Sequence, residues 1–118
     1  MAPHFRFKDV EIWQDAAEMS VKFHKLVEKL ERQKLYRYAE QLRAAGLSLP
    51  NNISEGAGSV HAPEFKQFLT IARRSCFEDA SVLLVFEKMV LVEREEIGVL
   101  LDDCDRLSRK ITNFSRIL

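Results

Sequence analysis

The chain has few residues that interrupt secondary structure. Only four glycines and three prolines occur among its 118 residues, and five of these seven lie between positions 46 and 63. A fold of many short strands needs turn residues at frequent intervals, so this scarcity argues against an all-β protein. The long uninterrupted segments on either side favour helices instead.

An excess of charge and long apolar runs are also absent. The 18 basic and 18 acidic residues give a formal net charge of zero, so any attraction to nucleic acid must come from a local patch. No apolar run approaches the roughly 20 residues that a membrane-spanning helix needs, and the first residues lack the apolar core of a signal peptide. We therefore expect a cytoplasmic protein without membrane association.

Cysteine is limited to Cys76 and Cys104, and neither belongs to a metal-binding motif. On adjacent antiparallel helices the two would be staggered by about six residues, or roughly 9 Å of rise, which is too far for a disulfide. We expect two buried free thiols. The histidines His4, His24 and His61 have no cysteine or carboxylate at ligand spacing, so no metal or cofactor is expected.

Candidate catalytic groups are equally sparse. Ser48 and Ser54 have no histidine in register that would activate them as nucleophiles. Gly56 and Gly58 follow a predicted helix, whose negative end repels phosphate, so they do not form a phosphate-cradling loop. The sequence therefore predicts a protein that is not an enzyme.

What the sequence does contain is a helical pattern of apolar residues, which recur at spacings of three and four. The pattern predicts helices over about residues 9–32, 37–55, 63–92 and 95–116, preceded by an arm at residues 1–8. Asp9 is expected to cap the first helix, and Pro63 suits the first turn of the third. Four such helices on short connections each have one apolar face to bury. We predict one domain over residues 1–118, an all-α, antiparallel up-down-up-down four-helix bundle.

The second predicted helix carries the most unusual stretch, residues 41–58. Its apolar stripe continues through Pro50, which is expected to kink the helix, and Gly56 is expected just beyond the C-cap. If residue 53 lies beside residue 65, Arg43 lies near Glu78. We hypothesise that these two form an ion pair that fixes the packing, with Ser48, Asn52 and Ser75 satisfying neighbouring polar groups. The alternative places Arg43 and Glu55 on a binding surface.

Basic residues gather in two places. Arg32, Lys34, Arg37 and Arg43, against Glu40 alone, give the first connection and the start of the second helix a formal charge of about +3. Lys66, Arg73 and Arg74 add to the third helix. These seven residues are candidates for contacts with a phosphate backbone, and a solvated helix face is the alternative. No exposed aromatic platform is evident from the sequence.

Three segments resemble a known family. They are Phe7-Lys8-Asp9-Val10-x-Ile12-Trp13-Gln14-x-Ala16, the run from Gln41 through Ser48-Leu49-Pro50-Asn51-Asn52-Ile53-Ser54-Glu55-Gly56-x-Gly58, and Glu64-Phe65-x-x-Phe68-Leu69-x-Ile71-Ala72-x-x-Ser75-x-x-Glu78. They are similar to bacterial four-helix-bundle proteins encoded by intervening sequences in large-subunit ribosomal RNA genes. The accessory variability proteins of diversity-generating retroelements are relatives of that family.

The resemblance implies a four-helix bundle, commonly a ring-like homopentamer, with no established catalytic activity. Some of the retroelement relatives bind nucleic acid and a reverse transcriptase. The motif positions that form a polar cluster here are Arg43, Ser48, Asn52, Glu55, Gly56, Ser75 and Glu78. Arg74 departs from the family, which usually has glycine there, so its side chain must point outward or widen the helix packing.

Together these patterns predict a non-catalytic oligomeric scaffold or accessory protein that binds RNA or DNA through repeated basic patches. The alternative is an adaptor that binds a polymerase, such as a reverse transcriptase, or another protein without touching nucleic acid.

Overall fold

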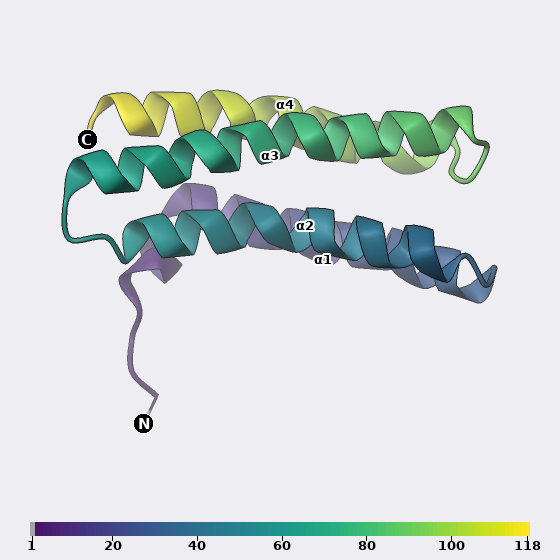
Figure 1. Cartoon of the computed structure of the whole chain (residues 1–118), viewed down its shortest axis with the longest axis horizontal. Helices are drawn as coiled ribbons and strands as arrows, with labels where there is room; N and C mark the ends of the chain where they lie inside the picture. Colours follow the sequence, from purple (N-terminus) through teal and green to yellow (C-terminus); the bar gives the residue numbers. More distant parts are fainter. Residues whose placement is uncertain (1) are drawn as a thin grey trace.

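The computed structural model describes residues 2–118, and within that range it contains four α-helices, one short 3-10 helix and no strand. The 3-10 helix η1 spans Arg6–Asp9, and the α-helices span Glu11–Arg32 (α1), Tyr36–Ala57 (α2), Ala62–Lys88 (α3) and Arg94–Arg116 (α4) (Figure 1). The predicted all-α class and the four helices are confirmed. Every helix end lies within four residues of its expected position, and Met1 of the expected arm falls outside the described residues.

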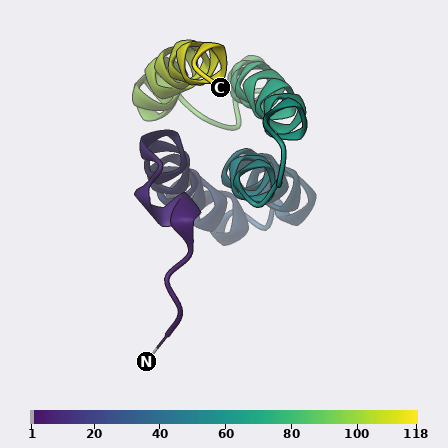
Figure 2. The same cartoon turned by 90° about the vertical axis from the view of Figure 1, so that its left-hand side faces the viewer.

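The helices pack in chain order around a shared core. α1 packs on α2, α2 on α3 and α3 on α4, and α4 returns to α1, as the end view shows (Figure 2). The chain reverses at alternating ends of the molecule (Figure 1), which agrees with the predicted up-down order. The predicted stripe of the second helix is buried throughout. The largest side chains with under 2% exposure include Phe23, Leu30, Leu42, Leu49, Ile53, Leu69, Leu83, Ile97, Leu107 and Ile111.

Pro50 is the basis of a close contact between α1 and α2. It lies inside α2 and has no N–H, so the carbonyl of Gly46, four residues earlier, loses its helical donor. The Ser20 hydroxyl of α1 donates to that carbonyl at 2.6 Å. Gly46 permits this approach because a Cβ there would meet the Phe23 side chain at 3.0 Å. One proline thus frees an acceptor that the neighbouring helix satisfies.

Gly56 sets the contact between α2 and α3. A Cβ at this position would lie 2.7 Å from the Cβ of Phe68 and 2.9 Å from a ring carbon of Phe65. The expectation that Gly56 follows the C-cap is wrong, because α2 continues to Ala57 and Gly58 is the C-cap residue. Gly56 serves instead as the small residue that lets the aromatic start of α3 reach the α2 backbone.

The expected helix ends differ at two other points. The N-cap of α1 is Val10 rather than Asp9, which belongs to η1. α3 ends at Lys88 rather than near residue 92, because Val90 adopts a φ of 60°. Lys34, after α1, is the other non-glycine residue of the described chain with positive φ, at 64°.

The expectation of two buried free thiols is confirmed, since Cys76 and Cys104 are both unpaired and buried. Burial, with a smaller contribution from the nearby Asp79 carboxylate, raises the pKa of Cys76 to about 12. The pKa of Cys104 is raised for the same two reasons. Neither thiol is therefore an activated nucleophile. Among residues 2–118, no helix is both long and apolar enough to cross a bilayer.

Val90 and Lys34 hold equivalent places in two helix-ending turns. After each residue the next N–H reaches back 2.9 Å to a helix carbonyl, from Leu91 to Phe86 and from Leu35 to Leu30. Glycine is the usual residue at such a position because a side chain costs about 1–2 kcal/mol there. Val90 is 85% exposed, so its side chain adds almost no packing in compensation.

Replacing Val90 with glycine should therefore stabilise the protein. We expect Val90→Gly to raise the free energy of unfolding by about 1 kcal/mol in urea denaturation, since the strain is relieved and little packing is lost. Val60 is a matched control, because it is 88% exposed and lies in a loop without positive φ. Val60→Gly should give no gain. Equal effects at both sites would contradict the assignment of strain to Val90.

Candidate nucleic-acid interface

Six of the seven predicted basic residues are exposed and make no ion pair within residues 2–118. They are Arg32, Lys34, Arg37, Lys66, Arg73 and Arg74. The structure does not bring them into one patch. The connection between α1 and α2 lies at the opposite end of the bundle from the start of α3 and the end of α4 (Figure 1). The chain therefore presents two separate basic surfaces.

Arg43 is the exception, and its predicted pairing with Glu78 is wrong. Arg43 Nη2 donates to Glu31 Oε2 of α1 at 3.0 Å, and Nη1 donates to Glu40 on its own helix. The hydrogen bond to Glu31 is the main reason that the pKa of Arg43 is raised. Arg43 lies on the side of α2 that faces α1, whereas Glu78 is exposed on α3. The assumed register was also shifted, because Ser48 rather than residue 43 lies opposite Ser75.

One basic surface is a groove between α3 and α4. Lys66 and Arg73 of α3 line it together with Arg116 of α4, and no acidic residue lines it. Its volume is about 510 Å³, and the remaining lining residues are Leu69, Thr70, Ile111, Thr112 and Ser115. The Arg73 guanidinium lies over the Phe77 ring, 5.4 Å from its centre, which orients the side chain. Arg116 was not among the predicted basic residues, because its proximity to Arg73 depends on the register of α3 against α4.

Arg74 lies outside this groove, and its side chain is exposed. The residue that replaces the family's usual glycine therefore points outward, while the neighbouring Ser75 is buried. The packing of α2 against α3 is not widened at this point, since the Ser48 and Ser75 hydroxyl oxygens lie 3.3 Å apart.

The remaining motif residues divide between the interior and the surface. Asn52 Nδ2 donates to the Ser48 carbonyl at 2.8 Å, and Ser75 Oγ donates to the Ile71 carbonyl at 3.1 Å. Ser48, Asn52 and Ser75 thus form the expected polar contact between α2 and α3. Glu55 and Glu78 are both exposed and take no part in it. The polar cluster is smaller than predicted and carries no charge.

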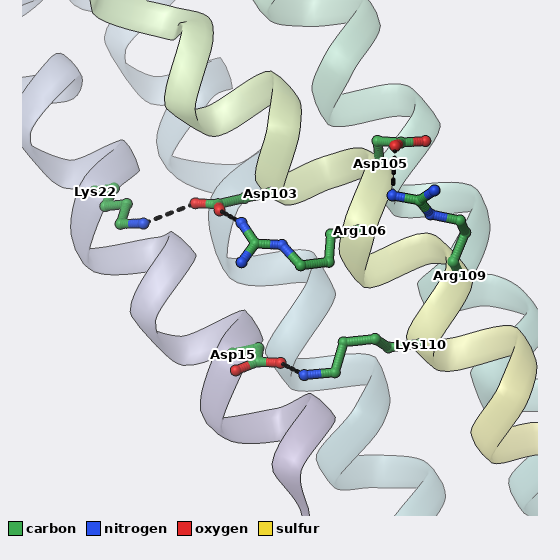
Figure 3. Close-up of polar contacts among 7 residues, drawn as sticks. All are labelled: Asp15, Lys22, Asp103, Asp105, Arg106, Arg109 and Lys110. Atoms are coloured by element: carbon green, nitrogen blue, oxygen red, sulfur yellow. Dashed lines mark hydrogen bonds and ion pairs between the residues drawn. The ribbon is translucent and has the colours of Figure 1, made fainter.

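On the α1–α4 face, by contrast, the basic residues form ion pairs with carboxylates. Asp103 accepts from Lys22 at 2.8 Å and from Arg106 at 2.6 Å (Figure 3). Lys110 reaches Asp15 and Glu11 of α1 at 2.5 Å each, and these hydrogen bonds raise its pKa, with Asp15 contributing most. Arg109 pairs with Asp105 on α4 itself (Figure 3). The ion pairs between α1 and α4 were not predicted, since they depend on the register between two helices that are far apart in the sequence.

One buried acid escaped sequence reasoning entirely. Asp79 of α3 is 1% exposed, and neither of its carboxylate oxygens has a hydrogen-bond partner within residues 2–118. Burial, followed by the charge of Glu78, raises its pKa to about 8, so it is protonated at neutral pH. A signal was present, because Ala72, Cys76, Asp79 and Leu83 continue one buried stripe at spacings of three and four.

The arrangement is that of an all-α, four-helix protein with two unneutralised basic surfaces. No group of three His, Cys, Asp or Glu residues in the described part of the chain is placed to hold a metal ion. The family model of the 23S rRNA-intervening sequence protein matches residues 8–113, and the chain belongs to this family. No curated protein sequence matches the chain significantly.

Asp79 should make stability depend on pH. Between its unfolded pKa of 3.8 and its folded value of about 8, only the unfolded chain ionises this group. The free energy of unfolding therefore falls as pH rises through that window, by up to about 1.4 kcal/mol per pH unit. Below pH 3.8 Asp79 does not change the pH dependence of the free energy of unfolding, and above about pH 8 the decrease that it causes is complete.

We expect Asp79→Asn to remove this loss, because an amide cannot ionise. The stability of the variant relative to the parent should rise between about pH 4 and pH 8 in urea denaturation at several pH values. Asp102→Asn, which changes an exposed acid on α4, is the control and should follow the parent curve. Parallel curves for Asp79→Asn and the parent would show that Asp79 is not buried as a neutral acid.

Proposed function

We propose that this protein is a non-catalytic, oligomeric scaffold or accessory subunit of the cytoplasm that binds RNA or DNA through its basic surfaces. The observation that carries the proposal is the uneven pairing of charge. The chain has no net charge, yet the cations of the α3–α4 groove and of the α1–α2 connection face no carboxylate within ion-pair distance among residues 2–118. Unneutralised cations of this kind bind phosphates and release counterions.

Self-assembly would strengthen such binding. α3 exposes four apolar side chains by 39–58%, namely Ile71, Phe77, Leu84 and Val85, and Met89 directly after it is 50% exposed. Exposed apolar side chains along one helix are available for a protein–protein contact. The proposal takes the assembly to be the homopentamer that the family resemblance implies. Repeating a modest basic surface around a ring would convert weak contacts into avid binding of a polyanion.

The second candidate function is an adaptor that binds a polymerase or another protein without touching nucleic acid. It would correspond to the accessory role of the retroelement proteins, with a reverse transcriptase as one possible class of partner. The ends of the chain favour it, because Phe5 is 57% exposed on the arm and Ile117 is 78% exposed after α4. The arm before η1 projects from the bundle (Figure 2). The Phe7 ring packs against Trp13, with ring centres 4.9 Å apart.

A salt titration tests the proposed function directly. We expect the chain to bind single-stranded RNA or duplex DNA at low salt. For each neutralised phosphate, log K should fall per tenfold increase in salt concentration by about 0.7 for single strands and about 0.9 for duplex. Two triple variants test the two surfaces. Glutamine replaces Lys66, Arg73 and Arg116 in one and Arg32, Lys34 and Arg37 in the other. Either variant should bind more weakly and show a flatter salt slope.

Arg109→Gln is the control for that titration, since Arg109 is exposed but already paired with Asp105 at 2.9 Å. It should leave the slope unchanged. An absence of binding to every probe at low salt would overturn the proposed function. A nuclease-resistant pull-down of one protein partner, together with that absence, would favour the adaptor.

A further inference from the structure

The connection between α1 and α2 combines exposed aromatic rings with basic side chains. Lys34, Tyr36, Arg37 and Tyr38, with Leu35, line one open hollow of about 400 Å³ at this end of the bundle. We call these four residues, together with Arg32, the tyrosine turn. It coincides with the first of the two predicted basic clusters, and its aromatic component was not anticipated from the sequence.

Both tyrosine rings are accessible to a ligand. Tyr36 is 57% exposed and Tyr38 is 37% exposed. The Tyr38 ring packs edge-on against Phe86 of α3, with centres 5.5 Å apart and planes at 85°. This contact fixes the Tyr38 ring on α3. The turn therefore offers one anchored ring and one more exposed ring.

The cations of the tyrosine turn have no competing acid within reach. Arg32, Lys34 and Arg37 are exposed and form no ion pair among residues 2–118. The acids on either side of the turn are Glu31 and Glu40, and both are held by Arg43. Arg43 thus binds both carboxylates that would otherwise be available to pair with these cations.

Lys34 adds an independent observation. Its φ of 64° is a conformation that favours glycine, and its exposed side chain pairs with no carboxylate among residues 2–118. A lysine at this position costs stability without returning a contact inside the described chain. Strain of this kind is typical of residues retained for binding.

We propose that the tyrosine turn binds a single-stranded segment of RNA or DNA. Bases would stack on Tyr36 and Tyr38, and Arg32, Lys34 and Arg37 would contact the flanking phosphates. The inference deepens the proposed function, on which it rests, by naming the nucleic-acid class and the site. Duplexes are disfavoured because their bases are already stacked, whereas unpaired bases present free faces to aromatic rings.

The aromatic role is tested with Tyr36→Ala and Tyr36→Phe in the full chain. The probes are fluorescent uridine and thymidine oligomers of about 12 nucleotides, and a hairpin duplex serves for comparison. We expect Tyr36→Ala to weaken single-strand binding by roughly 5- to 100-fold, because a stacked base is lost. Tyr36→Phe keeps the ring and should retain near-parent affinity, while duplex binding should change little in either variant. The uridine and thymidine arms show whether RNA, DNA or both are bound.

The basic role is tested with Lys34→Gly, for which Val90→Gly is a matched control. Both substitutions remove the strain that a side chain causes at positive φ after a helix, so both should raise the midpoint of urea denaturation. Only Lys34→Gly removes a cation of the tyrosine turn. It should lower single-strand affinity and reduce the salt slope by about 0.7, whereas Val90→Gly should leave both unchanged. A stabilised variant that binds less tightly cannot be explained by loss of folding.

The inference is overturned if Tyr36→Ala and Lys34→Gly bind the single-stranded probes as the parent does while the parent still binds nucleic acid. That result would leave the α3–α4 groove as the binding surface and the proposed function intact. Equal parent affinity for the hairpin duplex and the single strands would also overturn the inference alone. If the parent binds no probe at low salt, the inference and the proposed function fail together.

Discussion

The structure depends on a backbone carbonyl that its own helix cannot satisfy. Pro50 removes the donor that the Gly46 carbonyl would use in a regular helix, and the carbonyl is buried against α1. The Ser20 hydroxyl supplies the missing hydrogen bond. An unsatisfied buried acceptor costs about 1–3 kcal/mol, so this contact fixes both the rotation of α1 and its height along α2. Gly46 completes the contact, because any side chain there would displace Phe23.

The same helix positions its other neighbour by a similar device. Gly56 lets Phe65 and Phe68 reach the backbone of α2, and Ser48 meets Ser75 two turns earlier. α2 is therefore held on both sides, whereas α1 and α4 are linked by ion pairs across a more open seam (Figure 3). This difference determines which basic residues are paired. The α1–α4 seam pairs its basic residues internally, whereas the cations of the tyrosine turn and of the α3–α4 groove form no ion pair among residues 2–118.

The helices could be predicted because amphipathic spacing is a local property of the sequence. Leu42, Leu49 and Ile53 were assigned to the core and are buried. The pairing of Arg43 could not be predicted in the same way, since it depends on the register between helices. α2 extends to Ala57, two residues beyond the expected end, and the register shifts accordingly. Arg43 then lies beside Glu31 of α1, which the apolar pattern alone does not reveal.

The candidate site was predicted in part for the same reason. Clusters of basic residues are visible in the sequence, but whether each is neutralised depends on the partners that folding brings near it. Arg43 and Lys34 looked alike, yet one is paired and the other is not. Tyr36 and Tyr38 carry no sequence signal of exposure, since aromatic residues are more often packed inside. Asp79 was overlooked although it continues a buried stripe, because an aspartate is rarely fully buried without a partner.

A double-mutant cycle on Ser20 and Pro50 tests the central claim most directly. In the parent chain, Ser20→Ala should lower the free energy of unfolding by about 1–3 kcal/mol, because the Gly46 carbonyl loses the hydroxyl that donates to it. In the Pro50→Ala background the restored N–H serves that carbonyl, so Ser20→Ala should cost markedly less. Equal costs in the two backgrounds would contradict the account, because they would show that Ser20 does not replace the hydrogen bond that the proline removes.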